Sequence, residues 1–156
     1  MRAYADTSFL VKLLATEPDS ETVIAEYRRL GMPRLFFLPL HALETRNAIH
    51  HRAYHQRRSA SPEERRQIAH EKTAALSKLD QMLERRVFLA VSADWDAVLA
   101  RSRALSDAYT ERTGARTYDI LHIAFALELE CEVFLTCDER QAQVGRAEGL
   151  EIVAAA

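Results

Sequence analysis

The sequence predicts an α/β fold in which a mainly parallel sheet lies between layers of helices. Short apolar runs alternate with helical patterns along the whole chain, which is typical of parallel strands joined by helical crossovers. The first such unit is a short strand that breaks at Asp6 and turns at once into the apolar run 9–11. The next run, residues 34–38, is apolar almost throughout, as expected of a strand covered on both faces.

Five apolar runs predict the strands. They cover residues 2–5, 34–38, 87–91, 133–136 and 150–153. Between the first two, residues 8–14 predict a short helix, and residues 18–20 predict a break and a cap. A second helix with an apolar face at Val23, Ile24 and Tyr27 follows and ends at Gly31.

A long helical hairpin is expected over about residues 41–86. Its first helix begins near His41, after Pro39 has ended the second strand, and runs through Glu44 to Arg58. The second helix opens with a capping box in which Ser61 is the cap and Pro62 takes the first helical position. Its apolar side is formed by Ile68, Leu76, Leu79 and Leu83. The length of this hairpin predicts that it projects from the domain.

Three more helices complete the pattern. The first carries an inner stripe and ends at Gly114. The stripe consists of Trp95, Val98, Leu99, Ser102, Leu105 and Tyr109. Residues 118–130 form a helix that is apolar almost all round and therefore buried, and residues 139–148 form the last one.

Length and composition indicate an ordinary globular protein. The 156 residues suggest a single domain over residues 1–156, and 48% hydrophobic with 28% charged residues are average values. The net charge of -2 gives no global basic field, although charge segregated on one face remains compatible with nucleic-acid binding.

Several features point to the cytoplasm. Cys131 and Cys137 lack the spacing of a zinc site or a disulfide scaffold, so we expect two buried thiols in a reducing compartment. Asp6 and Lys12 interrupt the apolar N-terminus, which makes it a poor signal peptide. No apolar run is long enough to span a bilayer, and we expect no membrane association.

Four carboxylates occupy comparable positions. Asp6 and Asp138 follow predicted strands, whereas Glu44 and Asp119 lie near the starts of predicted helices. Functional groups of open parallel sheets gather at the carboxyl ends of strands, so all four can face the same edge. Clustered carboxylates repel, and Mg²⁺ or Mn²⁺ would cancel that repulsion. Such a site activates water and stabilises the leaving oxygen of a phosphodiester.

Each carboxylate also has a purely local interpretation. Asp6 and Asp138 can cap the helices that follow them, and Asp119 can stabilise a helix dipole from the first turn. Glu44 alone is typical of a solvated helix residue. Thr7 and Ser8 already offer capping chemistry beside Asp6. The combination of four favours the metal hypothesis over the separate local ones.

The motifs that carry these residues resemble those of PIN domains. Asp-Thr-Ser-Phe-Leu follows the first strand, and Leu-Glu-x-x-Asn-Ala-Ile lies on the helix of Glu44. Tyr-Asp-Ile-Leu-His-Ile-Ala-Phe-Ala contains Asp119, and Phe-Leu-Thr-Cys-Asp ends at Asp138. The resemblance spans almost the whole chain. Among PIN domains, the small stand-alone ones similar to this chain are VapC-type toxins of toxin–antitoxin pairs.

This resemblance implies an α/β/α sandwich, Mg²⁺- or Mn²⁺-dependent ribonuclease activity, a homodimer and a cognate small antitoxin protein. The matching metal positions are Asp6, Glu44, Asp119 and Asp138. Thr136 matches a position that supports the site by hydrogen bonding, and we expect Thr7 and Ser8 to support it as well. The hairpin over residues 50–86 is longer than the family pattern predicts.

Basic side chains along the hairpin suggest contacts to RNA phosphates. The candidates are Arg46, Arg52, Arg57, Arg58 and, next to the buried helix, Arg116. The alternative is a solvated helix face that nearby glutamates neutralise. His122, three residues after Asp119, is either a hydrogen-bonded core histidine or a group that orients a carboxylate.

Other functions fit the sequence less well. A dinucleotide-binding domain requires a glycine-rich loop after the first strand, and residues 6–8 contain no glycine. An aspartyl-phosphate phosphatase usually carries a second Asp where this chain has Ser8. A catalytically silent PIN-like interaction module and a stand-alone RNA-processing nuclease stay open as alternatives.

Overall fold

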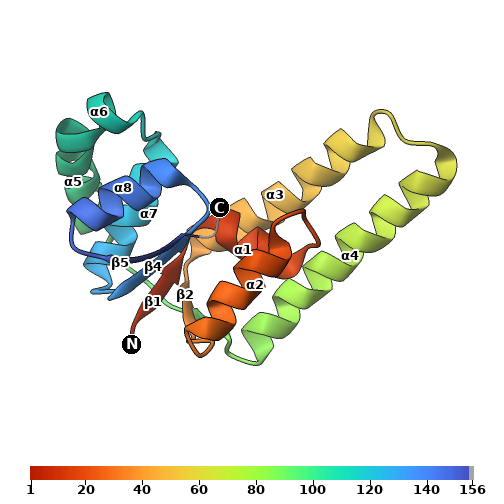
Figure 1. Cartoon of the computed structure of the whole chain (residues 1–156), viewed down its shortest axis with the longest axis horizontal. Helices are drawn as coiled ribbons and strands as arrows, with labels where there is room; N and C mark the ends of the chain where they lie inside the picture. Colours follow the sequence, from red (N-terminus) through yellow and green to blue (C-terminus); the bar gives the residue numbers. More distant parts are fainter. Residues whose placement is uncertain (155–156) are drawn as a thin grey trace.

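The computed structural model describes residues 1–154 and contains one sheet between helical layers (Figure 1). All strand pairs are parallel, and the order is β3-β2-β1-β4-β5. The strands are β1 (Ala3–Ala5), β2 (Leu35–Phe37), β3 (Phe88–Ala90), β4 (Val133–Thr136) and β5 (Glu151–Ala154). The predicted three-layer α/β/α sandwich is thereby confirmed, and its sheet is wholly parallel.

The order of the strands reverses beside β1. The chain passes from β1 to β2 and β3 on one side and then returns to β4 on the other side. In the register of β1 with β4, Ala5 pairs with Leu135, and the backbone N–H of Asp6 donates to the carbonyl of Leu135. Connections leave β1 and β4 toward opposite faces, which makes their carboxyl ends a switch point, the place where open α/β sheets bind ligands. We refer to this switch point as the crevice.

The helices fall into two groups that cover opposite faces of the sheet (Figure 1). One group contains α1 (Thr7–Leu14), α2 (Ser20–Arg29), α3 (Pro39–Arg57) and α4 (Pro62–Glu84). The other contains α5 (Trp95–Leu105), α6 (Glu111–Thr113), α7 (Thr117–Glu128) and α8 (Glu139–Ala147). A π-helical segment, η1 (Ser106–Thr110), joins α5 to α6.

Successive side chains of β1 point to opposite faces of the sheet, and they belong to two separate core clusters. Ala3 and Ala5 belong to the cluster that packs against α1 and α4, whereas Tyr4 belongs to the cluster on the side of α5 and α7. Both clusters are fully buried at the sheet, which explains the almost unbroken apolar character of the central strands.

The helices α3 and α4 lie side by side and extend well past the edge of the sheet (Figure 1). The capping box at the start of α4 is confirmed, since Ser61 and Glu64 each accept from the other's backbone N–H. Pro39 takes the first position of α3, so this helix begins two residues earlier than expected.

The predicted stripe from Trp95 to Tyr109 is wrong in part. Val98 and Leu105 are buried, but Trp95 and Leu99 are 44% and 48% exposed. Trp95 is the first residue of α5 and packs edge-on against buried Phe125 from the surface, and Leu99 lines an open pocket. Tyr109 in η1 does pack, partly buried, against the same core as Val98 and Leu105.

The two cysteines differ in burial. Cys131 is buried as predicted, whereas Cys137 is only half-buried. Within residues 1–154 no helix combines the length and the apolar character that crossing a membrane requires.

Candidate metal centre

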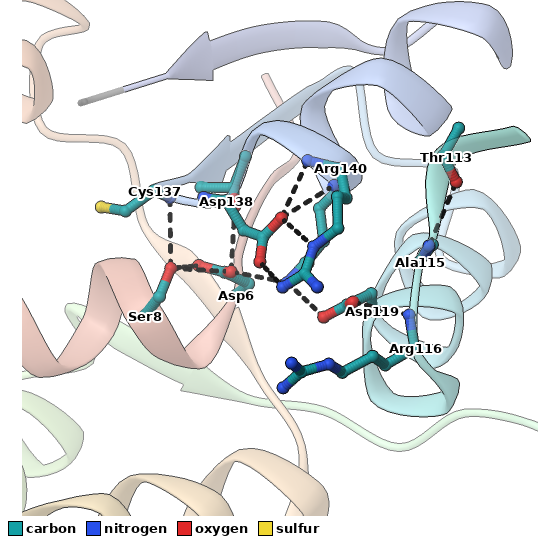
Figure 2. A network of polar contacts seen from close by, with 11 residues as sticks. Asp6, Ser8, Thr113, Ala115, Arg116, Asp119, Cys137, Asp138 and Arg140 are labelled. Carbon is teal, nitrogen blue, oxygen red and sulfur yellow. Dashed lines mark hydrogen bonds and ion pairs between the residues drawn. The ribbon is translucent and has the colours of Figure 1, made fainter. Parts of the chain in front are cut away.

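Asp6 lies at the crevice and is surrounded by neutral hydrogen-bond donors (Figure 2). It caps α1 by accepting from the backbone N–H of Phe9 at 2.9 Å. Ser8 Oγ lies 2.8 Å from both carboxylate oxygens, and Thr136 Oγ1 donates to Oδ2 at 2.9 Å. The amide nitrogen of Gln141 also donates to Oδ2 at 2.9 Å.

Burial dominates the electrostatics of Asp6. The side chain is 1% exposed, and within residues 1–154 it makes no ion pair with Lys or Arg. Loss of water raises the pKa of Asp6 above its ordinary value, although the nearby His122 and the hydrogen bonds act in the opposite direction. The local interpretation of Asp6 as the cap of α1 is confirmed. Ser8, Thr136 and Gln141 also donate to it, which a helix cap does not require.

Asp119 lies across the crevice from Asp6 and shares a donor with it. Its Oδ2 accepts from the backbone N–H of Arg116 at 2.7 Å, which satisfies a free donor at the start of α7. Its Oδ1 lies 3.2 Å from Gln141 Nε2, the same nitrogen that donates to Asp6. One neutral amide thus connects two carboxylates from β1 and α7.

Asp138 is next to this pair but faces a cation of its own. It caps α8 through the backbone N–H of Arg140, and the guanidinium of Arg140 contacts both carboxylate oxygens at 2.6 and 3.2 Å (Figure 2). These contacts hold the pKa of Asp138 below its ordinary value. Its backbone N–H donates to Thr136 Oγ1, which links Asp138 to Asp6 through one hydroxyl.

Glu44 enters from α3 and is oriented by two groups. Its Oε2 accepts from Thr7 Oγ1 at 3.0 Å and contacts His122 Nε2 at 2.9 Å. His122 Nδ1 in turn lies 2.8 Å from the hydroxyl of Tyr4. Burial raises the pKa of Tyr4 well above its ordinary value, so this hydroxyl keeps its proton beside the ring. His122 is therefore both a hydrogen-bonded core histidine and the group that orients Glu44.

The three supporting residues all contact the acidic side chains. Thr7 contacts Glu44, and Thr136 contacts Asp6. Ser8 contacts Asp6 and also accepts from the backbone N–H of Cys137 at 3.1 Å, which ties the end of β1 to the end of β4. These hydroxyls fix the acidic side chains in place.

A divalent cation fits the donors of this crevice through Asp6 and Asp119. Mg²⁺ keeps several waters and is usually held by one or two carboxylates, which matches a buried acidic pair with no cationic partner among residues 1–154. No group of three or more His, Cys, Asp or Glu side chains in that part of the chain is placed to hold an ion. Glu44 and Asp138 lie toward His122 and Arg140 instead.

The candidate RNA contacts differ in their surroundings. Arg46 pairs with Asp80 at 2.7 Å, and Arg52 donates to the carbonyl of Thr16 at 2.6 Å. By contrast, Arg57 and Arg58 line a groove of about 350 Å³ in the hairpin. The groove is completed by His50, Ala53, Tyr54, Arg65 and Lys72. Arg116 is exposed, and its side chain extends beneath Asp119 (Figure 2).

Sequence patterns missed Gln141, Arg140 and Tyr4 as parts of this site. A weak signal existed for Gln141, because it is polar yet lies on the apolar face of α8 with Ala142 and Val144. No local pattern connects Tyr4 to Glu44, since the contact runs through His122 on a distant helix.

An all-parallel α/β/α sandwich with a buried acidic pair at its switch point defines a class of protein suited to binding a divalent cation. The family model described as PIN domain matches residues 3–147, and the chain belongs to this family. PIN domains are generally metal-dependent nucleases. No curated protein matches the chain.

Proposed function

We propose that this protein is a metal-dependent endoribonuclease that cleaves RNA phosphodiesters at the acidic crevice. The observation that carries the proposal is the approach of Asp6 and Asp119 to one nitrogen at the carboxyl ends of the strands. Membership of a family of nucleases supports the reaction class. An acidic site without its cation would repel a phosphodiester, so the reaction requires Mg²⁺ or Mn²⁺.

The chain's own residues have separable roles in this proposal. Asp6 and Asp119 would hold the cation. Asp138 and Glu44 would add oxygen donors only on leaving Arg140 and His122. When bound, the cation supplies a more acidic water and charge stabilisation at the phosphate. Ser8 and Thr136 fix the rotamer of Asp6, and His122 fixes that of Glu44. Arg116, which is exposed beside Asp119, would bind a phosphate.

The test is charge removal at the acidic pair. Asp6→Asn and Asp119→Asn should each lower RNA cleavage by about 100-fold or more, because the cation loses an anionic ligand. Apo Asp6→Asn should melt at a higher temperature than the wild type, since a buried carboxylate carries a desolvation cost.

Asp107→Asn, a change of an exposed carboxylate, is the matched control and should leave both properties unchanged. EDTA should abolish cleavage by the wild type. Full activity of either purified variant, or of the wild type in EDTA, contradicts the proposal.

We further propose that the protein is the toxin of a toxin–antitoxin pair and forms a homodimer. A nuclease that attacks cellular RNA must be held silent, and the likeness of its motifs to VapC-type toxins points to a small antitoxin. A pull-down from the native host should recover that partner. If no small protein is recovered and no small open reading frame adjoins the gene, a stand-alone RNA-processing enzyme is favoured. A protein that Mn²⁺ does not stabilise against heat would instead be a silent interaction module.

A further inference from the structure

The amide of Gln141 occupies the position where charge compensation for the acidic pair is needed. The side chain is 5% exposed, and its nitrogen lies 2.9 Å from Asp6 Oδ2 and 3.2 Å from Asp119 Oδ1. Its two N–H groups are the only protons it can offer, and both oxygens they approach belong to candidate ligands. A neutral amide therefore joins the pair where a cation would be expected.

The other end of the same amide has no partner. Gln141 Oε1 is buried and accepts no hydrogen bond from residues 1–154. A buried carbonyl without a donor is unfavourable, so the carboxylates alone determine which way this amide is turned. If they acquired a different partner, nothing on the oxygen side would hold the amide in its present orientation.

A cation and the amide of Gln141 would compete for the carboxylate oxygens of Asp6 and Asp119. The protons of the nitrogen carry positive partial charge, and a cation bound between Asp6 and Asp119 would face them at short range. Binding of the cation therefore opposes both hydrogen bonds of Gln141 to the pair.

We propose that Gln141 is a positioning residue that substitutes for the cation in the metal-free protein and is displaced when the cation binds. The inference rests on the proposed metal-dependent function. It assigns Gln141 a stabilising role in the apo protein only, so the residue opposes metal binding. Removal of the amide should destabilise the apo protein and, by linkage, tighten binding of the cation.

The experiment measures two quantities on the full chain, in wild type and in Gln141→Leu. Heat denaturation in EDTA reports the stability of the apo protein, and calorimetric titration with Mn²⁺ reports affinity. We expect Gln141→Leu to melt at a lower temperature in EDTA and to bind Mn²⁺ about tenfold more tightly, the scale of a hydrogen bond to a charged group. Gln143→Leu, an exposed change on the same helix, should alter neither.

Gln141→Met provides a second route if the leucine variant does not fold, because methionine keeps the length and flexibility of the side chain. Weaker or unchanged Mn²⁺ binding in the Leu or Met variant overturns the inference, because the amide would then be a ligand or be uncoupled from the ion. A wild-type protein that binds no Mn²⁺ overturns the proposed function as well. The titration of the wild type thus separates the two failures.

Discussion

His41 shows how a single buried residue connects the sheet to the hairpin. Its Nδ1 accepts from the backbone N–H of Leu38 at 3.0 Å, so Nε2 carries the proton and donates to the carbonyl of Ala5 at 2.9 Å. The ring thereby ties the start of α3 to the end of β1, one residue before Asp6. Burial, and then the charge of His122, lower the pKa of His41 to about 3.

Because the pKa of His41 is lowered, the stability of the protein depends on pH over a defined range. Below an ordinary pKa of about 6.5, the unfolded chain binds a proton at His41 that the folded protein does not bind. The contribution of His41 to stability is thus complete above pH 6.5 and is lost as pH falls from there toward 3.

His41→Gln should remove up to about 1.4 kcal/mol per pH unit from the slope of unfolding free energy in that range. Urea denaturation at a series of pH values measures this slope, and His70→Gln, a change of an exposed side chain, is the control. Equal slopes in wild type and His41→Gln would contradict the assignment of a neutral His41.

At the scale of single residues, the sequence predicted where the acidic side chains lie better than it predicted which groups they contact. Asp6 and Asp138 could be placed because each directly follows an apolar strand, and strand ends meet at one edge. The amide bridge of Gln141 could not be predicted, because it depends on rotamers that only the packed α8 determines. The pairing of Asp138 with Arg140 was equally hidden, since neighbours two apart on a helix do not usually face each other.

At the scale of elements, the hairpin is the part that distinguishes this chain. Within residues 1–154, Arg57 and Arg58 make no ion pair, and they share their groove with Arg65 and Lys72. Tyr54 is 60% exposed at the same place, so an aromatic surface lies among cations. This combination is suited to single-stranded RNA, whose phosphates pair with cations and whose bases stack on aromatic rings.

Replacement of Arg57 and Arg58 by Ala should weaken the dependence of RNA binding on salt. Each phosphate contact to a single strand contributes about 0.7 to the slope of log K against log salt, so the double variant should lose about 1.4. Adding Arg52→Ala should change the slope little, because Arg52 is already bound to Thr16.

Arg28→Ala with Arg29→Ala removes the same charge from α2 and is the control. Fluorescence anisotropy with a labelled single strand, in a variant that cannot cleave, measures the slope. An unchanged slope would assign the hairpin groove to dimerisation or to simple solvation.

The bounds of the strands and helices show how far sequence patterns can predict secondary structure. Strand ends were correct to within one residue, because apolar runs between charged residues define them clearly. The partial failure at α5 has a different cause, since the helical spacing of Trp95 and Leu99 does not reveal that both side chains lie at the surface, 44% and 48% exposed.

At the scale of the whole molecule, the acidic crevice is the natural target of an inhibitor. An antitoxin arginine that enters it could form bidentate, charge-assisted hydrogen bonds with Asp6 or Asp119. At Asp138 it would have to displace Arg140, which already holds that carboxylate.

If the proposed antitoxin binds in this way, its inhibition should weaken as Mg²⁺ is raised, because cation and guanidinium compete for the same oxygens. Titration of the purified complex with Mg²⁺, with cleavage of a labelled RNA as the readout, measures this competition. Inhibition that is independent of Mg²⁺ would instead indicate an antitoxin that covers the RNA groove.

The alternation of strands and helices in the sequence predicted the fold class, but it did not predict the order of the strands in the sheet. Apolar runs show that β1 and β4 exist, whereas their adjacency depends on which helices pack on which face. The site lies between those two strands, so its geometry depends on the order of all the strands in the sheet, which the sequence pattern did not predict.

That adjacency has a consequence for synthesis on the ribosome. Asp6 is among the first residues to emerge, but its partners Thr136 and Gln141 are translated about 130 residues later. A nascent chain that has reached only α4 contains Asp6 and Glu44 but lacks Asp119 and the whole of β4. If this crevice cuts RNA, it cannot do so while most of the chain is still being made, and the translating messenger is protected until nearly the last helix has been synthesised.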